Sequence, residues 1–223
     1  MSKWTNIKQS IKDWISRKAD EPYLSMLKNE LKGCKSVLDV GYGIHSPVSR
    51  IPRTFHLEGI DLLPIPKKKF QMHDSYKKGD IRYLKKFYRK KSFDGAVVLD
   101  VIEHLSKSDA LQLLKDLEVI VRKKIIIMTP EGFHHQGEID GNPHMTHLSG
   151  WKTEEFKQKG YRTHGLQGLK IFRGEEASMK YKPWYFWLLI SHLSQSIAYF
   201  FPRIAFHIVA IKSLSTASDK KER

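Results

Sequence analysis

An acid and two glycines lie close together near the start of the chain. Asp39 sits inside an apolar run over residues 36–40, and Gly41 and Gly43 follow it. Such a run, rich in valine and leucine, is typical of a buried parallel strand. Paired glycines allow a tight turn and let a ligand approach the backbone. A buried carboxylate needs donors, so Asp39 predicts either a brace for the turn or a polar anchor for a ligand.

A second acid, Asp61, lies in the next apolar stretch, Phe55–Leu63. Its distance of about 20 residues from Asp39 is typical of a strand–helix–strand unit in which the acid ends the second strand. There a carboxylate can accept hydrogen bonds from both ribose hydroxyls of an adenosine-containing ligand. The intervening segment over 47–54 contains Pro52, so we expect a short or irregular crossover helix.

Two further motifs follow later predicted strands. Residues 79–84 read G-D-I-R-Y-L, where Asp80 is also a good N-cap for a helix over 81–88. Residues 93–105 read F-D-G-A-V-V-L-D-V-I-E-H-L, an apolar strand followed by an acid and then by Glu103 and His104. A helix over 108–121 and strands over 122–128, 169–172 and 205–211 are predicted next. Alternating strands and helices predict an α/β, doubly wound parallel sheet with ligands at the carboxyl ends of its strands.

Together these motifs resemble the class I S-adenosylmethionine (SAM)-dependent methyltransferases, whose first motif is D-x-G-x-G. Asp39, Gly41 and Gly43 match that motif, and the run ending in E-H-L is very like the family's fourth-strand signature. The family often has a third glycine where this chain has His45. A dinucleotide-binding protein is the competing interpretation, but its G-x-G-x-x-G would need a glycine at Ser46.

The resemblance implies a Rossmann-like fold, a seven-stranded, mostly parallel sheet with helices on both faces, and SAM as the cofactor. It implies ribose binding at Asp61, adenine contacts at Asp80 and Ile81, and the methionine moiety near Leu99 and Asp100. The predicted cofactor-binding residues are Asp39, Gly41, Tyr42, Gly43, Asp61, Leu62, Asp80, Ile81, Leu99 and Asp100.

Methyl transfer is an in-line displacement at an already activated sulfonium, so the enzyme chiefly positions the nucleophile and excludes water. A hydroxyl acceptor would also need a base. The candidate catalytic residues are His104, His147 and Asp100, because a neutral imidazole has suitable basicity near pH 7 and Asp100 lies beside the cofactor. Asp100 has a second interpretation, in which it faces the cofactor's ammonium.

The polar segment over 131–150 is interpreted as a substrate loop. His144, His147 and the following Trp151 are its predicted substrate-binding residues. Its histidines and acids are also possible metal ligands. However, no closely spaced ligand motif occurs, and no metal is predicted.

Composition limits the class of protein. With 223 residues and 40% hydrophobic residues, the chain suits one globular domain. A single cysteine, Cys34, excludes an internal disulfide, and the N-terminus lacks a signal-peptide pattern, so a cytoplasmic protein is expected. The net charge of +15 predicts an anionic partner: nucleic acid, an anionic membrane surface, or a charged glycan or lipid headgroup.

Three regions are expected: an N-terminal helical segment over 1–35, a methyltransferase domain over 36–212 and a charged tail over 213–223. Within the domain, residues 181–201 form an aromatic helix too interrupted by polar residues to span a membrane. One helical face carries Phe186, Leu189, Ile190, Leu193, Ile197 and Phe200. The helix either lies peripherally in a membrane interface, where Trp and Tyr are favoured, or covers the core.

The predicted function is therefore a SAM-dependent methyltransferase acting on an unidentified small molecule, sugar or lipid-linked intermediate. Two alternatives come from other classes. The charge favours an RNA-binding or RNA-modifying protein, and the missing third glycine favours a catalytically silent SAM-fold binding module. The acids Asp39, Asp61, Asp80 and Asp100 argue against the silent module.

Overall fold

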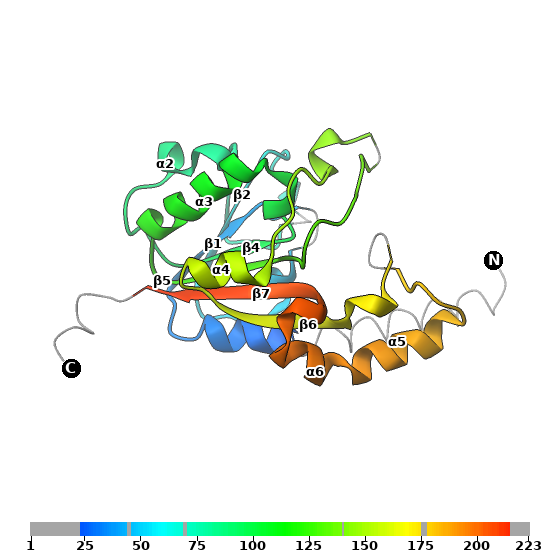
Figure 1. Cartoon of the computed structure of the whole chain (residues 1–223). Coiled ribbons are helices and arrows are strands. Elements are labelled where there is room, and N and C mark those ends of the chain that lie inside the picture. Colours follow the sequence, from blue (N-terminus) through cyan, green and yellow to red (C-terminus); the bar gives the residue numbers. More distant parts are fainter. Residues whose placement is uncertain (1–22, 44–45, 69–70, 140, 175–177, 215–223) are drawn as a thin grey trace, which may run out of the picture.

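The computed structural model describes residues 23–43, 46–68, 71–139, 141–174 and 178–214. They form a seven-stranded sheet in the order β3-β2-β1-β4-β5-β7-β6, in which β7 alone runs antiparallel to its neighbours (Figure 1). The strands are β1 Ser36–Val40, β2 His56–Asp61, β3 Ser75–Lys78, β4 Phe93–Leu99, β5 Val121–Pro130, β6 Arg162–Leu169 and β7 Ala205–Ser213. The predicted doubly wound, mostly parallel sheet is confirmed.

Both faces of the sheet are covered, because successive strand residues point to opposite sides. On one face Leu38 of β1 belongs to a core shared with Leu113 of α3 (Lys107–Ile120). On the other face Val37 shares a core with Leu27, in a helix over residues 23–30. Every residue of the central strand β4 is buried, as expected for a parallel strand between two helical layers.

Several shorter helices complete these layers. They are α2 (Leu84–Phe87), α4 (Thr153–Gln158), and the 3-10 helices η1 (Pro47–Arg50), η3 (Ile81–Tyr83), η4 (Ile102–His104), η5 (Pro143–Met145), η6 (Lys170–Phe172) and η8 (Pro202–Ile204). The crossover between β1 and β2 contains η1, which confirms the short or irregular helix expected there. The helix expected over 81–88 is split into η3 and α2. Helix α3 begins after Ser106, whose hydroxyl accepts from the Asp109 N–H at 3.1 Å.

The position predicted for the sixth strand is wrong. Residues 170–172 form η6, and the strand lies earlier, at Arg162–Leu169. This strand contains Gly165 and Gly168 and lacks an apolar run, so its sequence gives no strand signal of its own. Pairing with β7 and the close approach of two helices to its glycines stabilise it instead.

The aromatic segment forms two helices, α5 (Trp184–Leu193) and α6 (Gln195–Phe200), at the β6 edge of the sheet (Figure 1). Most of its apolar face is exposed rather than packed on the core, so the core-cover interpretation is wrong. Among the described residues, no helix combines the length and apolar character needed to cross a membrane. Residues 1–22 of the expected N-terminal helical segment and most of the charged tail lie outside the described residues.

Candidate active site

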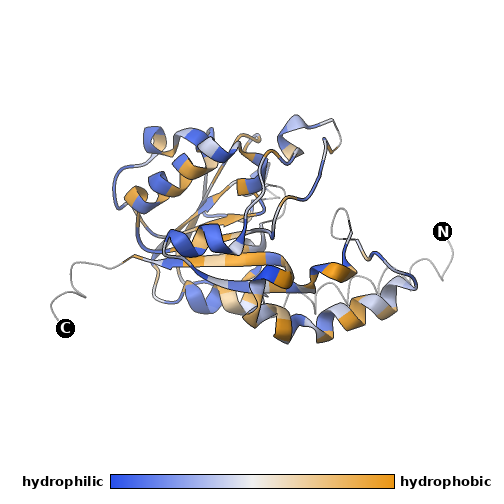
Figure 2. Cartoon of the chain, viewed as in Figure 1, coloured by the Kyte–Doolittle hydropathy of each residue, from blue (hydrophilic) through white to orange (hydrophobic). Residues whose placement is uncertain are grey.

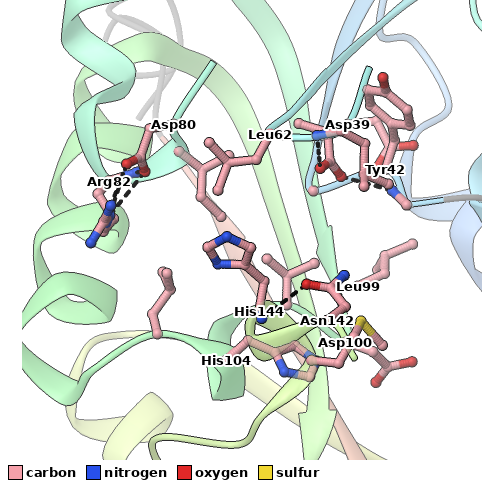
Figure 3. Close-up of a pocket in the computed structure, with 18 of the residues that line it drawn as sticks. Asp39, Tyr42, Leu62, Asp80, Arg82, Leu99, Asp100, His104, Asn142 and His144 are labelled. Carbon is pink, nitrogen blue, oxygen red and sulfur yellow. Dashed lines mark hydrogen bonds and ion pairs between the residues drawn. The ribbon is translucent and has the colours of Figure 1, made fainter. Parts of the chain in front are cut away.

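A cavity of about 660 Å³ lies at the carboxyl ends of the parallel strands, within the usual size range of small-molecule sites (Figure 3). The ends of β1, β2 and β4, the start of η3, and the loop around η5 contribute to its wall. All ten predicted cofactor-binding residues line it, namely Asp39, Gly41, Tyr42, Gly43, Asp61, Leu62, Asp80, Ile81, Leu99 and Asp100. Segments far apart in sequence therefore meet in one concave site, as the sheet topology requires.

The glycine turn after β1 depends on backbone conformations that favour glycine. Gly41 and Gly43 have φ values of +71° and +56°. A Cβ on Gly41 would lie only 2.7 Å from Cγ2 of Val101, whereas a Cβ on Gly43 would meet nothing within 4 Å. Gly41 therefore permits close packing against the end of β4, while Gly43 leaves the backbone open toward the cavity.

Asp61 links the ends of β1 and β2. Its Oδ2 accepts from the Gly43 N–H at 2.9 Å, and its Oδ1 accepts from the Leu63 N–H at 2.9 Å. Each carboxylate oxygen can accept more than one hydrogen bond. The acid therefore fixes the glycine turn while it keeps acceptor capacity for a ligand in the cavity.

Asp39 is braced by a histidine that the sequence analysis missed. The Nε2–H of His73 donates to Asp39 Oδ2 at 2.8 Å, and both side chains are buried. His73 also packs against Tyr42 and Tyr76, with ring centroids 5.2 and 5.0 Å away. His73 lies in the irregular segment before β3, and its position 34 residues after Asp39 gives no local signal of the pairing.

Two hydroxyls on the cavity wall lack a hydrogen-bond partner among the described residues. They belong to Tyr42 and Ser46, and both oxygens are buried. Burial, with a smaller contribution from Asp61, raises the pKa of Tyr42 to about 12, so its hydroxyl remains protonated. Both oxygens are closed off from solvent, and the Tyr42 ring packs against His73 and Tyr76 rather than toward the open part of the cavity.

Asp80 caps η3, as the alternative interpretation predicted. Its Oδ1 accepts from the Arg82 N–H at 2.9 Å, and its Oδ2 pairs with Arg82 Nη2 at 2.6 Å. The hydrogen bond from the Arg82 side chain lowers the pKa of Asp80 below its ordinary value. The carboxylate is therefore ionised and fixed at the cavity wall, where it can also accept from a ligand.

Asp100 has an unusual backbone conformation, and its side chain pairs with a histidine that the sequence analysis did not predict. Its φ is +54°, a region that non-glycine residues rarely adopt. Its Oδ1 lies 3.1 Å from Nε2 of His207, on the antiparallel strand β7. Such strain is typical of functional positions where the surroundings hold the residue. The turn directs the end of β4 into the cavity.

Glu103 is a structural residue at the base of the site. Its carboxylate accepts from Thr129 Oγ1 at 3.0 Å, and its backbone carbonyl accepts from the N–H groups of Leu148 and Ser149. Burial, with the nearby Asp100, raises the pKa of Glu103 above its ordinary value. Glu103 thus anchors the end of the 131–150 segment beside the cavity.

His104 lines the cavity, and His147 lies beside it with a ring-centroid distance of 4.8 Å. Nδ1 of His104 lies 3.2 Å from the Thr146 carbonyl oxygen, and Nδ1 of His147 lies 2.7 Å from the His134 carbonyl oxygen. A carbonyl only accepts, so each Nδ1 carries the proton and each Nε2 keeps a lone pair in the neutral ring. Burial, with the adjacent His147, lowers the pKa of His104 below its ordinary value.

The same residues form a group with the chemistry of metal ligands. Potential ligand atoms of Glu103, His104 and His147 lie within 4.8 Å of one another. A metal-binding histidine commonly donates its other ring N–H to a carbonyl, as both histidines do here. The group could hold a divalent cation, a possibility that the sequence spacing did not favour.

The three predicted substrate-binding residues have different positions. The His144 ring projects into the cavity, and its backbone N–H donates to the Asn142 side chain at 3.0 Å (Figure 3). His147 lies behind His104. Trp151 does not reach the cavity: it is fully buried in the core and packs against Phe156, with ring centroids 5.2 Å apart. Its assignment to substrate binding is therefore wrong.

Trp151 was placed in the site because it follows the polar segment directly. The chain instead turns inward at this point, where the Trp151 indole N–H donates to Ser149 Oγ. Asn142, Met145 and Leu148 line the cavity from this segment. They were not predicted, because neither their residue types nor their spacing form a motif.

No protein-family model matches the sequence, and no curated protein matches it either. Solved structures do. A SAM-dependent methyltransferase from Archaeoglobus fulgidus is 17% identical, with a TM-score of 0.54 over 88% of this chain and 94% of that one. A Burkholderia thailandensis 1,6-didemethyltoxoflavin N1-methyltransferase, with its substrate and S-adenosylhomocysteine bound, is 12% identical. Its TM-score is 0.56 over 94% of this chain and 84% of that one.

The [4+2]-cyclase SpnF is similar as well, at 10% identity and a TM-score of 0.54 over 90% of this chain and 83% of that one. One architecture thus includes proteins described by different reactions, so the likeness identifies the fold. Three observations support the same fold assignment: the strand order, the glycine turn after β1 and these structural neighbours. The chain has the fold of the class I SAM-dependent methyltransferases, the family that its motifs resemble.

Proposed function

We propose that this protein is a methyltransferase that uses SAM to methylate a small molecule, a sugar or a lipid-linked intermediate. The main supporting observation is that the ten residues expected to bind the cofactor all line one cavity. Solved methyltransferases of the same fold, one of them with bound S-adenosylhomocysteine, add support. SAM, when bound, supplies an electrophilic methyl group. The protein's residues bind the cofactor, orient the acceptor and, for a hydroxyl acceptor, remove its proton.

The residues present fit this cofactor. The Gly43 backbone is open toward the cavity, and Asp61 has acceptor capacity for ribose hydroxyls. Asp80 and Ile81 provide an acid and an apolar surface for an adenine ring. Asp100, whose side chain is half exposed, offers a negative charge for an ammonium group.

His104 is the preferred base if the acceptor is a hydroxyl. Its Nε2 lone pair accepts the hydroxyl proton, while its Nδ1–H stays bonded to the Thr146 carbonyl. The lowered pKa keeps the ring neutral near pH 7. Asp100 is less suited to this role, because His207 already lies at 3.1 Å from its carboxylate. His147 supports His104 from outside the cavity.

The deciding experiment is calorimetric titration of SAM and S-adenosylhomocysteine into the wild type and Gly41→Val. We expect saturable binding to the wild type and none to the folded variant, because a β-branched side chain would collide with Val101 and distort the turn. Gly33→Val is the matched control: Gly33 also has a positive φ, +79°, but a Cβ there meets nothing within 4 Å. Equal SAM binding by all three proteins would refute the cavity as the cofactor site.

A second experiment separates an enzyme from a silent binding module. Labelled SAM is incubated with the wild type and small-molecule, lipid and RNA fractions of a cell extract. Label in the small-molecule or lipid fraction is expected, and label confined to RNA would favour the RNA-modifying alternative. SAM binding without label in any fraction would favour the silent module.

A further inference from the structure

Helices α5 and α6 are rich in apolar residues (Figure 2). Most of their large apolar side chains are exposed. The exposed fractions of the exposed large apolar side chains on these helices range from 44% at Trp184 to 74% at Phe200, with Leu189, Leu193 and Ile197 between them. Phe201 and Ile204 continue the exposed apolar surface beyond α6. Monomeric proteins rarely expose large contiguous apolar patches, which usually mark interaction surfaces. We call this the α5–α6 face.

The polar side of the same helices points into the protein. Ser191 and Ser194 are buried, although an ordinary surface helix buries its apolar side. Ser194 Oγ accepts from the Leu169 N–H at 3.1 Å, and Ser191 Oγ donates to the Gln167 carbonyl at 3.2 Å. Gln195 accepts from one backbone N–H of β6 and donates to one of its carbonyls.

The reason for this reversed orientation lies in β6. Its register against β7 shifts between Leu166 and Leu169, and it is the last strand of the sheet. An edge strand presents backbone groups that need partners. Serine and glutamine side chains satisfy these groups, so the helices must direct their polar side toward the strand.

Two glycines hold the helices in this orientation. A Cβ on Gly165 would collide with the Ala198 carbonyl of α6, and a Cβ on Gly168 would collide with the Ser191 carbonyl of α5. The helix backbones therefore lie directly against β6. Rotation about the helix axes would break the hydrogen bonds to β6, so the apolar face stays exposed.

The segment that carries this face is basic. Residues 178–204 contain Lys180, Lys182 and Arg203 but no Asp or Glu, and the whole chain has a net charge of +15. Arg203 is ion-paired with Glu154 of α4, so Lys180 and Lys182 are the cations available to an anionic partner. Lys180 and Lys182 are exposed just before α5. Trp184 at the start of α5 and Tyr181 before it are also partly exposed. Aromatic residues with flanking lysines are typical of segments that lie in the interface of an anionic bilayer.

We propose that the α5–α6 face docks on an anionic lipid surface, with its apolar residues among the headgroups and acyl boundary and its lysines near the lipid phosphates. Helix α5 extends from the body on the side where β5 ends and the 131–150 segment begins (Figure 1).

The test is sedimentation with vesicles of phosphatidylglycerol and phosphatidylcholine compared with phosphatidylcholine alone. We expect stronger binding to the anionic vesicles, and high salt should weaken this binding without abolishing it. Leu193→Gln with Phe200→Gln should weaken partition at least about tenfold, since each large apolar side chain contributes through burial. Ile65→Gln with Val119→Gln is the matched control, because these exposed residues lie outside the face and the cavity.

Three further measurements keep the result decisive. Circular dichroism and SAM titration show whether the double variant is folded. If the double variant is not folded, the wild type is tested by quenching of its tryptophan fluorescence with brominated anionic lipid. We expect quenching, and we expect Trp184→Phe to reduce the quenched fraction. Wild-type protein that ignores both vesicle types would overturn the proposal. A second result would also overturn it. In that result the wild type shows no vesicle binding but forms concentration-dependent dimers without lipid, and the Leu193/Phe200 variant does not form them. A second copy of the chain would then occupy the face.

Discussion

Asp61 shows how one side chain can serve both the fold and a ligand. Its two oxygens accept from the N–H groups of Gly43 and Leu63, which fixes the glycine turn relative to the end of β2. Asp39, by contrast, is committed to His73 inside the protein. Of the two acids, Asp61 is therefore the one that we propose for ligand binding.

Asp61→Ala is expected to weaken SAM binding about 10- to 150-fold, the equivalent of about 1.5–3 kcal/mol for one charge-assisted hydrogen bond. Calorimetry measures the Kd. Asp74→Ala is the matched control, because Asp74 also accepts from a backbone N–H of β2, that of Leu57 at 2.7 Å, but does not line the cavity. An unchanged Kd in folded Asp61→Ala would contradict the ribose assignment.

His104→Gln is expected to lower kcat for a hydroxyl acceptor by about 10²–10⁴-fold, the usual contribution of a general base, with little change in the SAM Kd. Steady-state kinetics and calorimetry measure the two effects separately. His56→Gln, an exposed histidine on β2, is the control. Loss of wild-type activity in EDTA with recovery in Mn²⁺ would instead assign His104 and His147 to a cation.

At the scale of elements, Asp94 connects three strands at the amino end of the sheet. It begins β4 together with Phe93, accepts from the Lys35 N–H just before β1 at 2.7 Å, and accepts from Arg122 Nε on β5 at 2.8 Å. Burial raises the pKa of Asp94, but the bonds from Lys35 and Arg122 outweigh it, so the pKa lies below its ordinary value. The charged form is therefore the stabilising form.

Asp94→Asn is expected to lower the free energy of unfolding at pH 7 by about 1.5–3 kcal/mol, as for a lost charge-assisted hydrogen bond. Because the folded-state pKa is lowered, this stabilisation is fully present above the ordinary value of 3.8 and is lost as the pH falls through the folded-state pKa. Urea unfolding of both proteins between pH 7 and pH 3 measures it. A stability difference that did not shrink at low pH would contradict the ion-pair role.

At the scale of the whole molecule, the sheet separates two kinds of surface. The carboxyl ends of its parallel strands carry the cavity, whose walls combine acids, glycines and histidines with apolar side chains such as those of Leu62, Leu99 and Met145. The β6 edge carries the α5–α6 face, which is apolar and flanked by lysines. A positively charged chain with this arrangement can approach an anionic surface through one region while a separate region binds the ligand.

The sequence by itself determined the alternating elements and the meeting of distant motifs. The apolar run before Gly41, the spacing to Asp61 and the apolar run before Asp100 are local patterns, and a parallel sheet necessarily brings the strand ends together. The seventh strand was likewise evident from an apolar run, and β7 covers the predicted 205–211. Covalent spacing and side-chain periodicity are sufficient for such features.

Only the tertiary structure decided which side chains are paired and which faces are covered. The partners of Asp39 and Asp100, His73 and His207, come from segments that no spacing rule connects to them. The Trp151 side chain lies in the core rather than in the cavity, because the chain turns inward after Ser149. Helix periodicity identified the apolar side of α5, but the backbone groups of β6 selected the opposite side for packing, because unpaired polar groups at a sheet edge need hydrogen bonds.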